Sequence, residues 1–247
     1  MTPVACCGGE CGILVATTGA HWTSGTGWTV ATNIVRSGAR SLRYLPAGAN
    51  ATITFNGTGF GGTSGTTKVW REYIYFTTLP AADAILSWFD YSGSSAGWGF
   101  KLSDSKIYAA VEIAGVITFG ATGVVVTTGV WYRIDCKTVG SVVTGTADVQ
   151  VDGSAGGQAT GAFAGANSTN PNRGSNGVNA TMDAYFEDYV LSQTAGDYPI
   201  GAGKVLKFLP SRDGTHTGTA GMFDHGNAGI DILSTTTDAY RLVNKDV

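Results

Sequence analysis

The strongest constraint on the fold comes from residues 131–153, where two runs alternate strictly between apolar and polar or charged side chains. The first run is Tyr132-Arg133-Ile134-Asp135-Cys136-Lys137, and the second is Ala147-Asp148-Val149-Gln150-Val151-Asp152. A period of two, with one apolar and one charged face, is typical of an antiparallel strand that packs on one side only. If the two runs pair as a hairpin, Arg133 and Lys137 face a row that carries Asp148 and Asp152, and opposite charges support that register. The pattern predicts an all-β protein.

Further strand candidates recur along the chain, and no helical pattern of useful length interrupts them. The expected strands are Thr29–Val35, Ser41–Leu45, Ala51–Phe55, Lys68–Thr77, Ala84–Tyr91, Trp98–Leu102, Lys106–Ile113, Trp131–Thr138, Thr146–Val151 and Met182–Leu191. Many short strands at this spacing indicate a sandwich or a barrel. The links Gly57–Thr67 and Gly153–Asn179 are rich in small residues and turn dipeptides, so we expect both to be loops.

Composition narrows the range of partners. Glycine accounts for 37 of the 247 residues, and only 13% of residues are charged, which is about half the usual share. Such a weakly charged surface suits a protein whose faces meet neighbouring subunits or glycans, and a small-residue-rich β protein from a biased genome explains it equally well. The 15 Lys and Arg residues are scattered singly and the net charge is −3, which argues against nucleic-acid binding.

The sequence shows neither a secretory signal nor a membrane-spanning segment that we can recognise. The N-terminal residues have neither a positively charged region nor a long apolar run, so we expect no secretory signal. No segment reaches the roughly 18–20 apolar residues of a membrane span, and we expect no membrane partner. A viral structural protein, made in the host cytoplasm and exposed after lysis, would reconcile these features with a surface-like composition.

Four segments, in order, resemble the concanavalin A-like (laminin-G-like) jelly rolls. Ser37–Arg43, with the sequence SGARSLR, resembles the first core strand of that superfamily. The paired runs within Trp131–Gly153 are similar to its most recognisable hairpin, and Phe186–Ser192 (FEDYVLS) resembles its final core strand. The following Gly196–Gly201 and Lys204-Val205-Leu206 look like the exit segment of this domain in tailed-phage virion proteins.

The resemblance implies two antiparallel sheets packed as a jelly-roll sandwich of a dozen or so strands. It divides the chain into an N-terminal arm (1–26), a jelly-roll domain (27–200) and a C-terminal extension or arm (201–247). The superfamily contains lectins, glycosidases, adhesion domains and structural virion modules, so the fold alone does not assign a function.

Glycoside hydrolysis requires two carboxylates held across a cleft. Retaining glycosidases of this fold carry them on one strand as Glu-x-Asp-x-x-Glu, and this chain has no such run. Glu10, Glu72 and Glu112 are isolated. In Asp183-x-x-x-Glu187-Asp188 the spacing differs, and adjacent residues of a strand should point to opposite faces. We therefore expect no enzymatic activity.

The cysteines and histidines offer only weak metal or disulfide patterns. Cys136 alternates inward with Ile134 and is expected in the core. Three N-terminal thiols, Cys6, Cys7 and Cys11, could form disulfides between subunits, take part in a zinc site with a fourth ligand, or remain free. The polar segment from Asp213 to Asp231 is better explained as a solvated loop, and we expect neither a metal nor another cofactor.

Glycan binding would need exposed aromatic rings beside Asn or Asp side chains. Trp28 and Trp98 are the main candidates for stacking on a sugar. The wider set also includes Trp22, Trp88 and the loop at Tyr91, with Asp90 and Asp104 nearby in sequence. Trp70 and Trp131 are expected in the core.

Two functions remain open. The first is a non-enzymatic phage virion protein, either a capsid decoration or a tail or fibre component, that contacts copies of itself and other virion proteins. The alternative is a lectin-like module that recognises surface polysaccharide.

Overall fold

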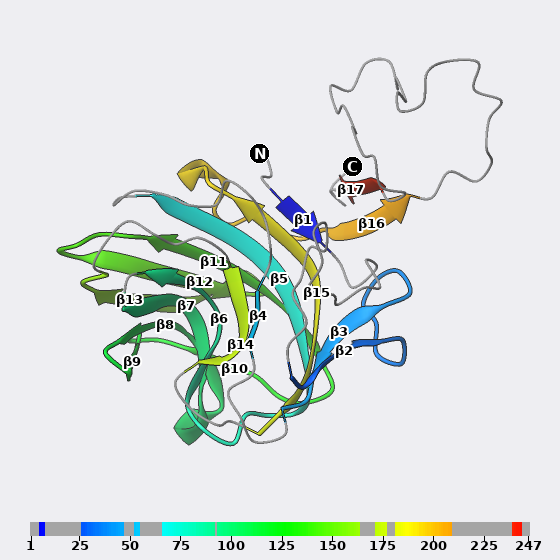
Figure 1. Cartoon of the computed structure of the whole chain (residues 1–247), viewed down its shortest axis with the longest axis horizontal. Helices are drawn as coiled ribbons and strands as arrows, with labels where there is room; N and C mark the ends of the chain where they lie inside the picture. The colour runs from blue at the N-terminus through cyan, green and yellow to red at the C-terminus, as the bar shows by residue number, and fades with distance from the viewer. Residues whose placement is uncertain are drawn as a thin grey trace, which may run out of the picture.

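The fold is a sandwich of two antiparallel β-sheets, as the sequence predicts (Figure 1). A computed structural model describes residues 5–7, 26–46, 52–54, 66–91, 93–163, 171–176, 181–208 and 239–243. Within them, helical structure is limited to two short 3₁₀ turns, Leu102–Asp104 and Ala195–Asp197. No helix in these ranges is long and apolar enough to cross a membrane.

One sheet has eight strands. In order across the sheet they are β13 (Ser154–Gly161), β12 (Gly145–Val151), β11 (Trp131–Val139), β5 (Thr67–Thr78), β15 (Asp183–Ser192), β3 (Ser41–Tyr44) and β2 (Trp28–Ala31), with β1 (Ala5–Cys7) also paired to β15.

The other sheet has seven strands. They are β10 (Val124–Val125), β8 (Lys106–Ile113), β7 (Ser94–Lys101), β6 (Ala84–Tyr91), β14 (Pro171–Asn176) and β4 (Thr52–Thr54), with β9 (Val116–Phe119) also paired to β8. A separate two-stranded antiparallel sheet pairs β16 (Lys204–Phe208) with β17 (Ala239–Val243).

The core lies between the two sheets and is built from alternate residues of their strands. Trp70, Ile74 and Phe76 of β5 belong to the same buried cluster as Trp98 and Phe100 of β7. Cys136 is fully buried in this cluster, as predicted. The alternation of side chains along each strand therefore decides which of them face the core.

The hairpin predicted from residues 131–153 is present, and its register is confirmed. β11 and β12 pair antiparallel with Lys137 opposite Asp148, and Lys137 Nζ lies 3.4 Å from Asp148 Oδ2. At the far end of β12, Asp152 and Gly153 both have positive φ (50° and 85°), which is the geometry of a tight two-residue hairpin turn into β13.

The prediction that Gly153–Asn179 forms a loop is wrong, because this segment contributes β13 and β14. Its small residues serve a close approach instead. A Cβ atom on Gly157 would lie only 2.6 Å from the carbonyl oxygen of Thr122. A larger residue would therefore push β13 away from the segment that precedes β10. The other predicted loop, Gly57–Thr67, lies almost wholly outside the described residues.

The first strand, β1, and the pair β16–β17 lie close together beside β15 (Figure 1). β1 pairs with the second half of β15, with Cys6 opposite Val190, while β3 pairs with the first half. β16, which pairs with β17, follows directly after the segment that leaves β15. Most of the predicted arms, 1–26 and 201–247, lie outside the described residues, so their boundaries stay predictions.

Candidate functional site: a polar network on the outer face of the seven-stranded sheet

The outer face of the seven-stranded sheet carries a connected set of polar side chains. We call this set the polar network, and its members are Thr54, Trp88, Asp90, Ser95, Glu112, Asn172 and Asn176. They come from β4, β6, β7, β8 and β14, so five strands contribute to a single surface.

Strand register places the acidic members in one row. Asp90 of β6 is the partner of Ser95 of β7, and Ser95 is the partner of Glu112 of β8. The residues that alternate with them, such as Tyr91, Ala96 and Val111, belong to the core. Because successive side chains point to opposite faces, the Asp90–Ser95–Glu112 row lies on the outer face.

Asp90 is exposed, and three donors hold its carboxylate in place. Trp88 Nε1 and Asn172 Nδ2 each donate to it at 2.7 Å, and Ser95 Oγ donates at 3.1 Å. The amide oxygen of Asn172 in turn accepts a 2.7 Å bond from Thr54 Oγ1. An ionised carboxylate offers roughly four acceptor positions, so Asp90 can accept one further hydrogen bond from a ligand.

Asn176 connects the second carboxylate to this arrangement. Its Nδ2 lies 2.9 Å from Ser95 Oγ and 3.2 Å from Glu112 Oε2, and the N–H of Gly115 donates to Glu112 Oε1 at 2.6 Å. The two carboxylates are therefore orientated by fixed partners, and they present hydrogen-bond acceptors at set positions on the sheet.

An apolar row lies beside the acidic row. Trp88, Gly97, Ala110 and Phe119 are successive cross-strand partners, and Trp88 packs with Ile85 and Ala110 in a small cluster separate from the core. Trp88 is only 3% exposed, and its indole packs within this cluster while its Nε1 donates to Asp90. Trp88, Gly97 and Ala110 are all buried and Phe119 is half-buried, so this row supports the network, and the groups left for a ligand are the carboxylate acceptors.

The two tryptophans predicted to stack on a sugar are buried. Trp98 is 0% exposed, and its Nε1 donates to Glu72 Oε1 at 2.8 Å in the core. Trp28 is 6% exposed and stacks on Tyr44 with ring centroids 4.6 Å apart. Neither ring offers a free face, because both belong to inward-facing positions of their strands. Trp88, another of the candidate aromatics, is buried as well, but its indole donates to Asp90, which lies two residues further along β6.

The prediction that Trp131 belongs to the core is also wrong. Trp131 is half-buried and contacts Tyr75, with ring centroids 5.5 Å apart. Cross-strand register continues this row to Tyr185 on the outer face of the eight-stranded sheet. The first residue of a strand gives little periodicity from which to assign its face.

Glu72, predicted to be an isolated carboxylate, is a central polar group of the core. It is fully buried, forms an ion pair with Arg173 of the opposite sheet, and accepts from the indoles of Trp70 (3.2 Å) and Trp98. Because its ligands come from β5, β7 and β14, Glu72 joins the two sheets and is not available to a substrate.

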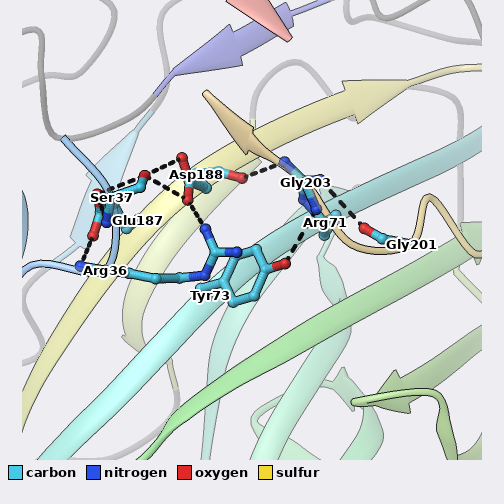
Figure 2. Close-up of polar contacts among 8 residues, drawn as sticks. All are labelled: Arg36, Ser37, Arg71, Tyr73, Glu187, Asp188, Gly201 and Gly203. Atoms are coloured by element: carbon cyan, nitrogen blue, oxygen red, sulfur yellow. Dashed lines mark hydrogen bonds and ion pairs between the residues drawn. The ribbon is translucent and has the colours of Figure 1, made fainter. Parts of the chain in front are cut away.

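A second polar cluster lies on the outer face of the eight-stranded sheet, and we call it the bulge cluster: Arg36, Ser37, Glu187 and Asp188 (Figure 2). The pairing of β15 with β5 shifts between Glu187 and Val190, and Asp188 has a φ of 52°. This β-bulge inserts one residue and turns both carboxylates toward Ser37. The expectation that adjacent residues point to opposite faces therefore fails here.

The bulge cluster is covered by the chain itself. Arg71 donates to the carbonyl oxygens of Asp188 and Gly201, each at 3.2 Å, and the N–H of Gly203 donates to Tyr73 Oη (Figure 2). Asp135 accepts a 2.9 Å bond from the N–H of Gly201 and is fully buried. The face that the sequence pattern marks as charged is thus closed by the segment leaving β15.

Burial has a strong effect on Glu187. Desolvation, together with the neighbouring charge of Asp188, raises the pKa of Glu187 to about 8, against the opposing hydrogen bonds from Arg36 and Ser37. Perturbed carboxyl groups often mark functional sites, but this one is only 4% exposed and lies beneath the 32–40 loop.

The remaining predicted thiol and metal positions are described only in part. The backbone of Cys6 and Cys7 forms β1, while Cys11 and the segment from Asp213 to Asp231 lie outside the described residues. Within the described residues no group of three His, Cys, Asp or Glu side chains could hold a metal ion.

Sequence comparison identifies no relative: no protein-family model and no curated protein matches this chain. Several solved structures resemble parts of it. Cellulose induced protein Cip1 has 14% identity and a TM-score of 0.46 over 70% of this chain and 87% of its own. The T. cruzi calreticulin globular domain has 8% identity and a TM-score of 0.49 over 72% and 85%.

Domain 4 of AbnA, a GH43 extracellular arabinanase from Geobacillus stearothermophilus solved in complex with arabinotriose, has 12% identity and a TM-score of 0.46 over 69% of this chain and 81% of its own. At these identities and scores the likenesses carry no argument about function. Function has to be argued from the residues of this chain.

Proposed function

We propose that this protein is a non-enzymatic, lectin-like module that binds carbohydrate through the polar network of the seven-stranded sheet. The observation that carries the proposal is the exposed carboxylate of Asp90, held by Trp88, Ser95 and Asn172. A fixed and exposed carboxylate acceptor suits a sugar, whose hydroxyl groups donate to carboxylates.

Binding fits this geometry better than hydrolysis. A general acid must carry a proton to the leaving group, whereas Asp90 and Glu112 both accept from several fixed donors. We therefore retain the expectation that the protein is not an enzyme.

The test is a titration with a panel of neutral and acidic polysaccharides, followed by intrinsic tryptophan fluorescence and calorimetry. For a saccharide that binds, Asp90→Asn should weaken the affinity about tenfold or more, since a hydrogen bond to a charged group contributes about 1.5–3 kcal/mol. Asp148→Asn, on the other sheet, is the matched control and should leave the affinity unchanged. Equal binding by the wild type and Asp90→Asn would overturn the assignment of the site.

A second candidate is a structural component of a phage virion, either a capsid decoration or a tail or fibre part. The supporting observations are the pairing of β1 with β15 and the anchoring of Gly201 by Arg71 and Asp135, since both ends of the domain then extend from one region. In this role the arms would contact copies of the chain and other virion proteins, in a particle assembled from protein made in the host cytoplasm.

Deletion of Gly203–Val247 tests this second role. The truncated domain should remain folded but fail to assemble, and the copy number per gradient-purified particle should distinguish a shell component from a tail part. Normal assembly of the truncated protein, or absence of the protein from any particle, would remove the virion role and leave the binding module.

A further inference from the structure

The bulge cluster contains a hydrogen-bonding conflict that an extra proton resolves. Ser37 Oγ lies 3.2 Å from Glu187 Oε1 and 3.0 and 2.9 Å from the two carboxylate oxygens of Asp188 (Figure 2). A hydroxyl group has one proton and two lone pairs. Between two ionised carboxylates it can donate to only one of them, and its lone pairs would then face the oxygen of the other.

We propose that Glu187, Ser37 and Asp188 share a proton, and that this proton-sharing latch fastens the 32–40 loop to the eight-stranded sheet and opens when the proton is lost. With Glu187 protonated, its hydroxyl donates to Ser37 Oγ, and Ser37 donates to the ionised Asp188. Every polar group in the chain of three then has a partner, and Asp188 keeps its ion pair with Arg36.

The backbone of the loop depends directly on the same carboxyl group. The N–H groups of Arg36 and Ser37 donate to the two oxygens of Glu187 at 2.6 and 3.0 Å. Arg36 also stacks its guanidinium on Tyr73, 3.4 Å from the ring centroid. Loss of the proton would place a second buried anion beside Asp188, and the structure can relieve that repulsion by moving the loop outward.

The surrounding charges set the pH at which Glu187 would lose its proton. The charged and titratable groups of the described residues around Glu187 are Asp188 on β15, Arg36 in the loop, Arg71 and Tyr73 on β5, Arg133 on β11 and Arg43 on β3. Arg43, Arg133 and Arg36 are each engaged by another carboxylate, namely Asp183, Asp135 and Asp188. Glu187 is thus left with backbone and hydroxyl donors, consistent with its raised pKa of about 8.

Opening of the latch should also affect the segment that leaves β15, around Gly201. Arg71 bridges the carbonyl oxygens of Asp188 and Gly201, so movement of the bulge changes the anchor of that segment. The latch thereby couples the 32–40 loop to the start of β16.

Hydrogen exchange on the full-length chain tests the latch. The wild type and Glu187→Gln have the same sequence in the 32–40 loop, so their intrinsic exchange rates cancel at each pH. At pH 6 the loop amides should exchange equally in both proteins. At pH 9 the wild type should exchange up to about tenfold faster, because one pH unit above the titration midpoint leaves roughly ten ionised groups for each protonated one.

Glu112→Gln is the matched control and should follow the wild type at both pH values. Equal exchange by the wild type and Glu187→Gln at pH 9 would overturn the proposal. If Glu187→Gln fails to fold, a carbon-13 NMR titration of the Glu187 carboxyl in the wild type decides instead. A midpoint near pH 8 supports the latch, and a midpoint near 4.5 overturns it.

Discussion

The two outer faces of this sandwich treat their charged residues in opposite ways. On the eight-stranded sheet Arg71, Asp135 and Asp188 are almost fully buried, because the 32–40 loop and the residues around Gly201 cover them. On the seven-stranded sheet Asp90 remains exposed, although three side chains hold it. A buried charge requires its partners for folding, whereas an exposed and orientated charge remains available to a ligand.

The difference therefore separates polar groups that stabilise the fold from polar groups that are available to a ligand. Both faces contain acidic side chains in cross-strand rows, and composition alone cannot distinguish them. What distinguishes them is access to solvent: Asp135 is fully buried between Arg133 and Gly201, whereas Asp90 stays exposed although three donors hold it.

The largest effect should come from Glu72, which lies between the two faces. Glu72→Ala removes the acceptor for Arg173 and for the Trp98 indole, and we expect a loss of about 3–5 kcal/mol in the free energy of unfolding. Urea denaturation at neutral pH measures this loss. Glu112→Ala, a carboxylate on the open face, should cost less than about 1 kcal/mol. Similar losses for both variants would contradict the distinction between buried and open carboxylates.

The next effect compares the two faces directly. Arg71→Met removes two hydrogen bonds of a buried guanidinium, and we expect the unfolding free energy to fall by about 3 kcal/mol. Asp90→Asn keeps an acceptor for the buried Trp88 indole, so its stability should change by less than about 1 kcal/mol while its ligand affinity falls. Thermal and urea unfolding of the two variants provides the measurement. A strongly destabilised Asp90→Asn variant would mean that the polar network is structural as well.

Sequence reasoning succeeded where periodicity was uninterrupted. The alternation over residues 131–153 predicts the β11–β12 register, and the burial of Cys136 follows from it. The bulge at Asp188 could not be predicted, because one inserted residue leaves the sequence of β15 looking like an ordinary strand. The burial of Asp135 was equally hidden, since it depends on Gly201, which lies 66 residues away along the chain.

The candidate site was predictable only in fragments. Trp88 and Asp90 are two residues apart on one strand, which places them on the same face. Their partners Asn172 and Asn176 lie in a segment whose Asn-Pro and Asn-Arg-Gly composition indicated a loop. Bringing these residues together requires β14 to pair with β6, and no local pattern announces such a long-range pairing.

The covered face should also respond to pH. The pKa of Glu187 is about 8 in the folded protein, above its ordinary value of 4.5, so protonation favours folding. Its contribution is complete below pH 4.5 and is lost as the pH rises through 8. The urea midpoint of the wild type should therefore fall relative to that of Glu187→Gln between pH 5 and pH 9.

Comparison of the two proteins also removes a competing effect. Burial lowers the pKa of Lys68 to about 8, which favours folding at higher pH, and this contribution is common to both. A difference between the midpoints that stays constant with pH would show that Glu187 does not titrate with folding in this range.

The smallest effect belongs to the Lys137–Asp148 pair, which tests the rim of the covered face. Both side chains are partly exposed, at 27% and 19%, so a double-mutant cycle with Lys137→Ala and Asp148→Ala should give a coupling of about 0.2–1 kcal/mol. Lys137 also lies over the Tyr198 ring at 4.8 Å, and this contact is lost in Lys137→Ala alone. Lys137→Ala should therefore cost less in a Tyr198→Leu background than in the wild type. If Lys137→Ala costs the same in both backgrounds, Tyr198 adds nothing to the attachment of the segment around Gly201, which would then depend on Arg71, Tyr73 and Asp135.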